Sequence, residues 1–147
     1  MNIIGLGGAA CNVASKFSEY PQYNVIYMDT KNRNYTGKNI VIKTQNSHEE
    51  YEKALPQLKF KLEDEDVLFL VCGAGDISGA SLKVLEQIKQ KLKNGVVDVL
   101  YIKPEQNSLG TQAKLKHRLT FQVLQQYTRS NLLNRLYVVD NGMVEKI

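Results

Sequence analysis

Short apolar runs alternate along the chain with segments whose hydrophobic residues recur at helical spacing. Six runs have the length and the β-branched or aromatic content of buried strands. These runs are Asn2–Leu6, Tyr23–Asp29, Ile40–Lys43, Val67–Val71, Val96–Ile102 and Leu136–Val139. Because Val67–Val71 is continuously apolar, we expect it to be a central strand covered on both faces.

Helices are predicted between these strands. They are expected from about Ala10 to Tyr20, from Ser47 onward, through residues 82–92 and from Thr111 to Tyr127. Ser47 and Glu50 have the spacing of a capping box, while Pro56 is expected to kink or end the helix that they open. In the last helix, apolar residues at every fourth position predict one apolar face, formed by Leu115, Leu119, Val123 and Tyr127.

The alternation of strands and helices predicts a single α/β domain over residues 1–147. We expect three layers in a Rossmann-like arrangement, with a mostly parallel six-stranded sheet and helices on both faces. A chain of 147 residues fits one hydrophobic core, and 43% hydrophobic with 23% charged residues is ordinary for a globular protein. No second domain is therefore expected.

The formal net charge of +4 does not by itself indicate binding to nucleic acid. Lys and Arg alternate with acidic residues, as in residues 59–65, which favours a solvated surface over a basic stripe. The same interpretation is preferred for Lys114, Lys116 and Arg118 on the last predicted helix. His48 and His117 have no nucleophile or paired carboxylate at useful spacing, and we expect both at the surface.

Cysteine usage and hydropathy bear on where the protein resides. Cys11 and Cys72 lie far from any metal-ligand spacing, and we see no secretory leader, so reduced thiols in the cytoplasm are expected. No apolar run approaches the roughly 20 residues that span a bilayer. Since no His partner accompanies Cys11 in the sequence, a packed thiol is favoured over a nucleophile.

Two glycine-rich turns are the segments most indicative of function. Each lies between a predicted strand and a predicted helix, at residues 5–12 and 73–80. Glycine lets the backbone approach a ligand closely, and the start of the following helix presents unpaired N–H groups to an anion. The two turns together predict a cradle for phosphate groups, with a tight connection that binds no ligand as the alternative for each.

Carboxylates accompany both turns. Asp29 and Thr30 end a strand at the crevice where open α/β sheets bind ligands, and a turn-forming role for Asp29 is an equal alternative. Asp76 in the second turn would repel a phosphate unless a cation such as Mg²⁺ lay between them.

The order of these motifs resembles the nucleotide-binding half of the FtsZ/tubulin family over nearly the whole chain. The family pattern I-G-V-G-G-G-G-G-N-A-V aligns without a gap on residues 4–14, with Asn12 at its Asn. The family's I-N-T-D-A loop is similar to residues 28–32, and its signature G-G-G-T-G-T-G-A-A resembles residues 73–81. Its T-K-P-F loop is similar to residues 102–105, and its I-P-N-D strand end resembles residues 139–142.

The resemblance implies a guanine-nucleotide site, with GTP or GDP and Mg²⁺ as ligands, and self-association or a larger protein assembly as its context. It assigns no catalytic residue and no metal site held by the protein alone. The residues that it places at the nucleotide are Gly7, Gly8, Ala9, Ala10, Cys11, Asn12, Asp29, Thr30, Gly73, Ala74, Gly75, Asp76, Ile77, Ser78, Gly79 and Asn141.

The chain also departs from the family pattern. Asp76 and Ile77 stand where the family has small residues against phosphate, and residues 44–50 lack the glycines of the family's third phosphate loop. The family's sugar-binding Glu falls near Leu109, and its central helix and C-terminal activation domain have no counterpart in the 147 residues. Weak or no GTPase activity of the isolated chain is therefore expected.

Three functions follow from these features. The first is a truncated FtsZ/tubulin-like guanine-nucleotide-binding protein that acts in assembly or filament formation. The second is a structural or interaction module that keeps the fold without binding nucleotide. A dinucleotide-dependent oxidoreductase is least favoured, because Ala10 stands at the third position of the Gly5-x-Gly7 fingerprint and no catalytic dyad is visible.

Overall fold

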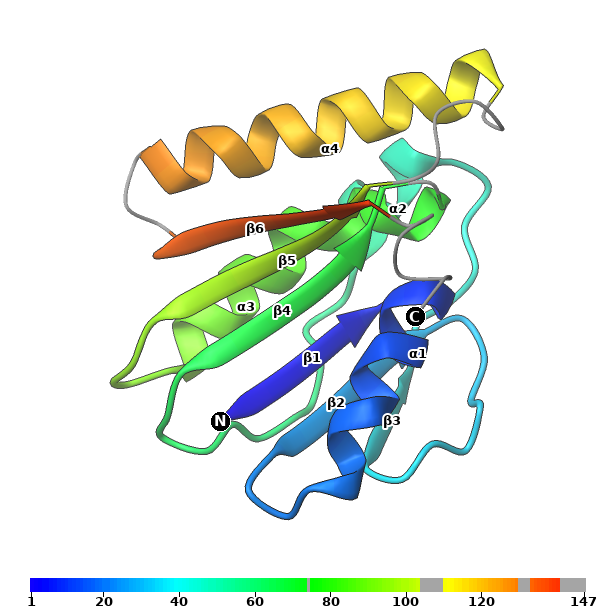
Figure 1. Ribbon diagram of the computed structural model, residues 1–147. Coiled ribbons are helices and arrows are strands. Elements are labelled where there is room, and N and C mark those ends of the chain that lie inside the picture. The colour runs from blue at the N-terminus through cyan, green and yellow to red at the C-terminus, as the bar shows by residue number, and fades with distance from the viewer. Residues whose placement is uncertain (74, 104–109, 130–132, 141–147) are drawn as a thin grey trace.

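The computed structural model describes residues 1–73, 75–103, 110–129 and 133–140, except the side chains of residues 111–113 and 116. Within these residues, six strands form one parallel sheet in the order β3-β2-β1-β4-β5-β6 (Figure 1). The strands are β1 (Asn2–Leu6), β2 (Asn24–Asp29), β3 (Lys38–Val41), β4 (Val67–Cys72), β5 (Val97–Lys103) and β6 (Arg135–Asp140). The helices are α1 (Gly8–Ser15), α2 (His48–Ala54), α3 (Ser81–Lys91) and α4 (Thr111–Arg129), with 3₁₀ helices η1 (Lys16–Glu19) and η2 (Asp76–Ala80). The predicted six-stranded Rossmann-like α/β fold is confirmed.

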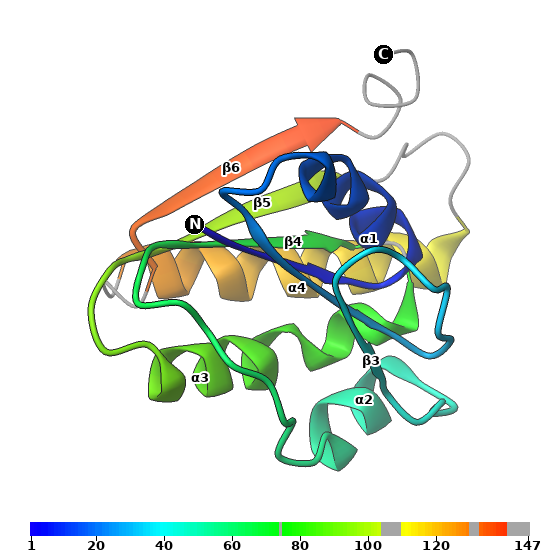
Figure 2. The same ribbon diagram turned by 90° about the horizontal axis from the view of Figure 1, so that it is seen from below.

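Helices cover both faces of the sheet, which makes three layers. Figure 2 shows α1 on one side of the sheet and α2, α3 and α4 on the other. Ile3 and Leu70 point toward α1 and pack with Ala14, whereas Phe69 belongs to the core beneath α3, together with Leu85. As predicted, β4 lies in the interior of the sheet, between β1 and β5.

The ends of the elements follow from local chemistry. α1 begins at Gly8, earlier than predicted, because Gly7 adopts φ 90° and turns the chain directly from β1 into the helix. The Ser47 hydroxyl accepts a hydrogen bond from the Glu50 N–H at 3.2 Å, as a capping box requires. α2 ends at Ala54, before Pro56, as the sequence predicted.

The predicted apolar face of the last helix is wrong in its first half. Leu115 and Leu119 are 53% and 47% exposed, whereas His117, Thr120 and Leu124 are the buried residues among the described side chains of α4. A repeat of four residues drifts around a helix that has 3.6 residues per turn, so the leucines leave the buried face within two turns.

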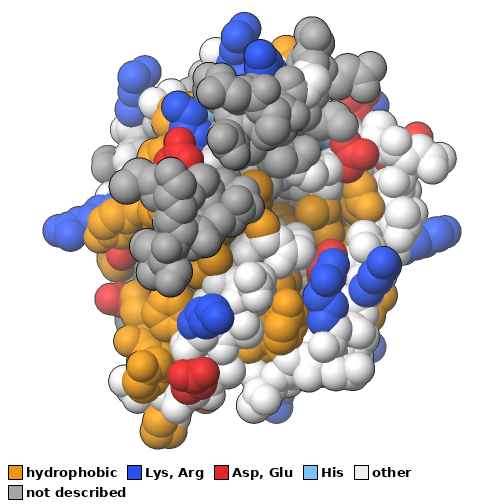
Figure 3. All heavy atoms as spheres, turned by 45° about the vertical axis from the view of Figure 1, so that its right-hand side comes forward, with side chains coloured by type: hydrophobic (Ala, Val, Ile, Leu, Met, Phe, Trp, Pro, Cys, Tyr) orange, Lys and Arg blue, Asp and Glu red, His pale blue; other side chains and the backbone are white. Residues whose placement is uncertain are grey.

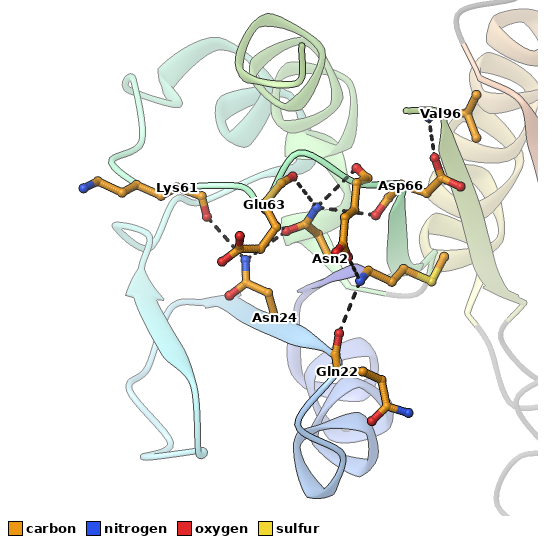
Figure 4. A network of polar contacts seen from close by, with 9 residues as sticks. Asn2, Gln22, Asn24, Lys61, Glu63, Asp66 and Val96 are labelled. Carbon is orange, nitrogen blue, oxygen red and sulfur yellow. Dashed lines mark hydrogen bonds and ion pairs between the residues drawn. The ribbon is translucent and has the colours of Figure 1, made fainter. Parts of the chain in front are cut away.

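A buried asparagine, Asn2, forms a hydrogen-bond network at the amino-terminal edge of the sheet (Figure 4). The Asn2 amide donates to the Glu63 carbonyl at 2.9 Å, and its oxygen accepts from the Glu63 N–H and from the Asn24 amide, each at 2.9 Å. These bonds join β1 to β2 and to the segment that enters β4. Since the Asn2 side chain has no exposed surface, its polar atoms depend on these partners.

Candidate functional site

The two glycine-rich turns meet at the carboxyl ends of β1 and β4. These strands are neighbours, paired in register from Asn2 with Val67 to Leu6 with Val71. A Cβ added to Gly7, directly after β1, would stand 2.9 Å from the Cγ2 methyl of Ile77 in the second turn. The connections from β1 and β4 run to opposite sides here, and open α/β sheets bind their ligands at such a switch point.

The start of α1 presents backbone donors at this point. Gly7 is its N-cap and has no side chain to offer, and no capping side-chain hydrogen bond is found for α1 among the described residues. Ala9 is exposed, whereas Ala10 is buried, so an approaching group would meet backbone more than side chains. The first helical turn therefore has the unpaired N–H groups and the positive dipole end that suit an anion.

Arg33 is a residue of this site that the sequence argument missed. Its Nε donates to the Asp29 carboxylate at 3.0 Å, and its Nη2 lies 3.3 Å from the position of a Cβ added to Gly8. The Asp29 Oδ2 atom lies 3.9 Å from the same position, so the ion pair of Arg33 and Asp29 stands beside the start of α1. The sequence signal for this ion pair was a basic residue, Arg33, four positions after the acidic residue Asp29 that ends a strand.

The Asp29 carboxylate is engaged by the chain itself. Its second oxygen accepts a hydrogen bond from the Thr30 N–H at 2.8 Å, so the turn-forming role is present alongside the ion pair with Arg33. The space between Cys11, Asp29, Arg33 and Tyr35 is too narrow to admit a water molecule. The ends of β2 and α1 are therefore tightly closed on this side.

Cys11 is a packed thiol, as expected. Its Sγ has no exposed surface and lies 3.4 and 3.5 Å from the carbonyl oxygens of Gly5 and Met28, the two acceptors within reach of its single S–H. Burial, with a smaller contribution from the charge of Asp29, raises the pKa of Cys11 to about 12. A thiol of this kind stays protonated near neutral pH and is a poor nucleophile.

In the second turn, residues 75–77 are accessible to solvent, whereas those at its end are buried. Ser78 is buried and donates to the Gly75 carbonyl at 2.8 Å. Gly79 lies so close to the backbone of His48, the first residue of α2, that no side chain fits there. Gly75, Asp76 and Ile77 are therefore the described residues of this turn that retain exposed surface near the first turn.

The expectation that both histidines lie at the surface is wrong. His117 is 8% exposed, and its Nδ1 lies 2.5 Å from the Tyr101 hydroxyl. Burial, together with the charges of Lys103 and Arg118, lowers the pKa of His117. His48 is half-buried, with its Nε2 at 3.1 Å from the Thr120 hydroxyl. Tertiary packing of α2 and α4 against the strand ends buries these rings.

Some of the expected site residues are not placed. Ala74, Leu109 and Asn141 lie outside the described residues, as does the second half of residues 102–105, the segment compared with the T-K-P-F loop. In the described part of the chain, no three His, Cys, Asp or Glu side chains gather as a metal-ion site. None of the described helices is long and apolar enough to cross a bilayer.

Charged side chains are dispersed on one side of the molecule. On the side of the molecule that Figure 3 brings forward, Lys and Arg side chains are interspersed with uncharged and apolar surface.

No family model matches the chain, and a search of curated proteins finds no match. The FtsZ/tubulin resemblance therefore stays a prediction.

Proposed function

We propose that this protein is an FtsZ/tubulin-like guanine-nucleotide-binding protein that holds the phosphates of GTP or GDP between its two glycine-rich turns. The observation that carries the proposal is the contact between Gly7 and Ile77, which brings both turns together at the switch point of the sheet. The order of motifs along the chain supports guanine over other bases, through the family resemblance.

The chemistry of the first turn supports phosphate binding. The N–H groups of Gly8, Ala9 and Ala10 would donate to phosphate oxygens, and the Arg33 guanidinium, which the structure pairs with Asp29, would exchange part of that ion pair for the phosphate. Mg²⁺ often binds through one or two carboxylates together with substrate phosphates, and Asp76 at the start of η2 is the carboxylate that fits this role. Bound Mg²⁺ would screen Asp76 from the phosphate.

Hydrolysis in this proposal depends on a partner. In the FtsZ/tubulin family an acidic loop of a neighbouring subunit activates the reaction, and the proposal takes this dependence over from the resemblance. We expect the purified chain to turn over GTP at less than about one per minute, which is slow beside ordinary enzymes. Assembly with further copies or with other proteins is the context that this dependence suggests.

A second candidate function is a structural module without nucleotide. It is favoured by Asp76 and Ile77, which stand in the second turn where the family has small residues against phosphate. In this alternative the turns serve only as tight connections, and the closed space beside Asp29 and Arg33 is permanent.

Nucleotide titration of an N-terminal helix variant separates the two candidates. Ala9→Asp places a carboxylate at the exposed start of α1, where it is compatible with the helix dipole but repels phosphate. We expect GTP with Mg²⁺ at 100 times its Kd to stabilise the wild-type protein by about 2.7 kcal/mol in a thermal-shift assay, and Ala9→Asp to lose most of this effect.

The matched control is Gln22→Glu, which adds the same charge at the opposite edge of the sheet and should leave the shift intact. GDP, ATP and NAD are titrated in parallel to establish base preference. Absence of a shift with every nucleotide would reject the binding proposal in favour of the structural module.

A further inference from the structure

Four lysines line one hollow at the amino-terminal edge of the sheet, opposite the glycine-rich turns. The hollow has a volume of about 650 Å³ and lies beside the starts of β2 and β3 and the end of α3. Lys38, Lys59, Lys61 and Lys91 line it, and none of the described residues that line it is Asp or Glu. We call this feature the lysine hollow.

One wall of the lysine hollow is the extended segment 57–61, which is fastened near both ends. At one end the buried Gln87 of α3 accepts from the Leu58 N–H and donates to the Pro56 carbonyl, each at 2.9 Å. At the other end the Asn24 amide donates to the Lys61 carbonyl at 3.4 Å. The wall is thus held to both the helix layer and the sheet.

The base of the hollow is apolar. Ile26, Leu58 and Phe60 contribute to the lining, and each is less than a tenth exposed. The Lys91 ammonium lies 4.6 Å from the centre of the Phe60 ring, which places a cation at this base. Alternation along residues 58–61 turns Leu58 and Phe60 inward and leaves Lys59 and Lys61 exposed.

The charge that lines the hollow is positive throughout its described residues. Among the described residues, no ion pair involves any of the four lysines. Their number equals the whole excess of Lys and Arg over Asp and Glu, 19 against 15, so the rest of the chain is formally neutral. A cleft lined by one sign of charge raises the local concentration of ligands of the opposite sign.

We propose that the lysine hollow binds an amphipathic organic anion, with at least two negative charges and an apolar group. Phosphate esters are the common biological ligands of this class, and the lysine ammonium is a frequent phosphate partner. The volume lies within the range of small-molecule sites, which combine an apolar lining with a few polar groups. The proposal does not rest on nucleotide binding at the glycine-rich turns.

Fluorescence titration with bis-ANS, an aromatic disulfonate dye, tests the proposal on the full chain. The dye carries two negative charges on apolar rings, and its emission rises when the rings leave water. We expect saturable binding by the wild-type protein. The double variant Lys59→Gln/Lys61→Gln should weaken binding by about tenfold or more, because two exposed ammonium groups leave the rim.

The matched control, Lys16→Gln/Lys53→Gln, removes two exposed lysines that do not line the hollow and should bind the dye as the wild type does. A second pair, Lys38→Gln/Lys91→Gln, removes the remaining two cations and should also weaken binding if the site is the hollow. Equal affinities of the wild type and both hollow pairs would overturn the proposal, as would an equal loss in the control pair.

Discussion

The hydroxyl of Tyr101 occupies the space that a side chain at Gly73 would need. From there it donates to the His117 carbonyl at 3.2 Å and lies 2.5 Å from the Nδ1 of the same histidine. Gly73 begins the second glycine-rich turn directly after β4, and His117 lies on α4. The lack of a Cβ at Gly73 therefore lets the turn, β5 and α4 pack as one unit.

Substitution of Gly73 should show that the packing of Tyr101 requires a residue without a side chain at this position. Gly73→Ala is expected to lower the free energy of unfolding by about 1–3 kcal/mol, because the new methyl displaces the Tyr101 hydroxyl. Tyr101→Phe alone should cost about 1–2 kcal/mol through the lost hydrogen bonds. Loss of the hydroxyl removes the closest of these clashes, although the Cζ of the ring would still stand 2.7 Å from the new methyl. The double variant should therefore lose at least about 0.5 kcal/mol less than the sum of the two single losses.

Urea unfolding of the four proteins measures the cycle. Gly110→Ala is a control for added side-chain volume, since no described atom lies within 4 Å of a Cβ added there, and it should cost less than Gly73→Ala. Strict additivity of Gly73→Ala and Tyr101→Phe would contradict the proposed packing.

Stability should fall on mild acidification because of His117. Its native pKa is lower than the ordinary value of 6.5, owing to burial and to the charges of Lys103 and Arg118. The unfolded chain therefore takes up a proton at a higher pH than the native protein, so native stability is lost as the pH falls from about 6.5 through the native pKa. His117→Asn should reduce the fall in the urea midpoint between about pH 7 and pH 5.5.

His48→Gln serves as the comparison for this experiment, because it removes a histidine and leaves His117 in place. It should retain most of the decline. A decline that is undiminished in His117→Asn would show that other groups cause it.

The Asn2 side chain should contribute measurably to stability. Asn2→Ala removes the acceptor of the Glu63 N–H and of the Asn24 amide, as well as the donor to the Glu63 carbonyl. We expect a loss of about 1–3 kcal/mol in the free energy of unfolding, measured by urea denaturation. Asn24→Ala leaves the bonds between Asn2 and Glu63 intact and should cost less than half as much. Equal losses in the two variants would argue against Asn2 as the centre of the network.

Cys11 should resist thiol reagents in the native protein. In a Cys72→Ser background, which leaves one thiol, reaction with an aromatic disulfide reagent near pH 8 should be at least about a hundredfold slower than in urea. Burial and the pKa of about 12 both suppress the thiolate of Cys11. Fast native labelling would mean that α1 opens readily from β1, or that the thiol is not buried.

Most of the fold could be predicted because its signals are local. The apolar run at Val67–Val71 indicated an interior strand, and the Ser47–Glu50 spacing with Pro56 gave the limits of α2. Strand character and capping depend on neighbours within a few residues, so they are visible in the sequence. The positions of both glycine-rich turns, each between a strand and a helix, followed in the same way.

The face of α4 could not be predicted because partners distant in the sequence determine it. Leu115 and Leu119 belong to the apolar pattern of the sequence, yet both are exposed. The buried face is instead the one that carries His117, which contacts Tyr101 of β5. Arg33 escaped notice for a similar reason, since its place beside Gly8 depends on how the loop after β2 folds back over α1.

By itself, the sequence determined the class of fold, the order of its elements and the edge of the sheet where the glycine-rich turns lie, because periodicity and turn chemistry act over short distances. Tertiary structure alone decided that Ile77 stands against Gly7 and that four lysines, scattered from Lys38 to Lys91, line one hollow. Such contacts arise only when strand order brings distant segments together, and no local pattern records them.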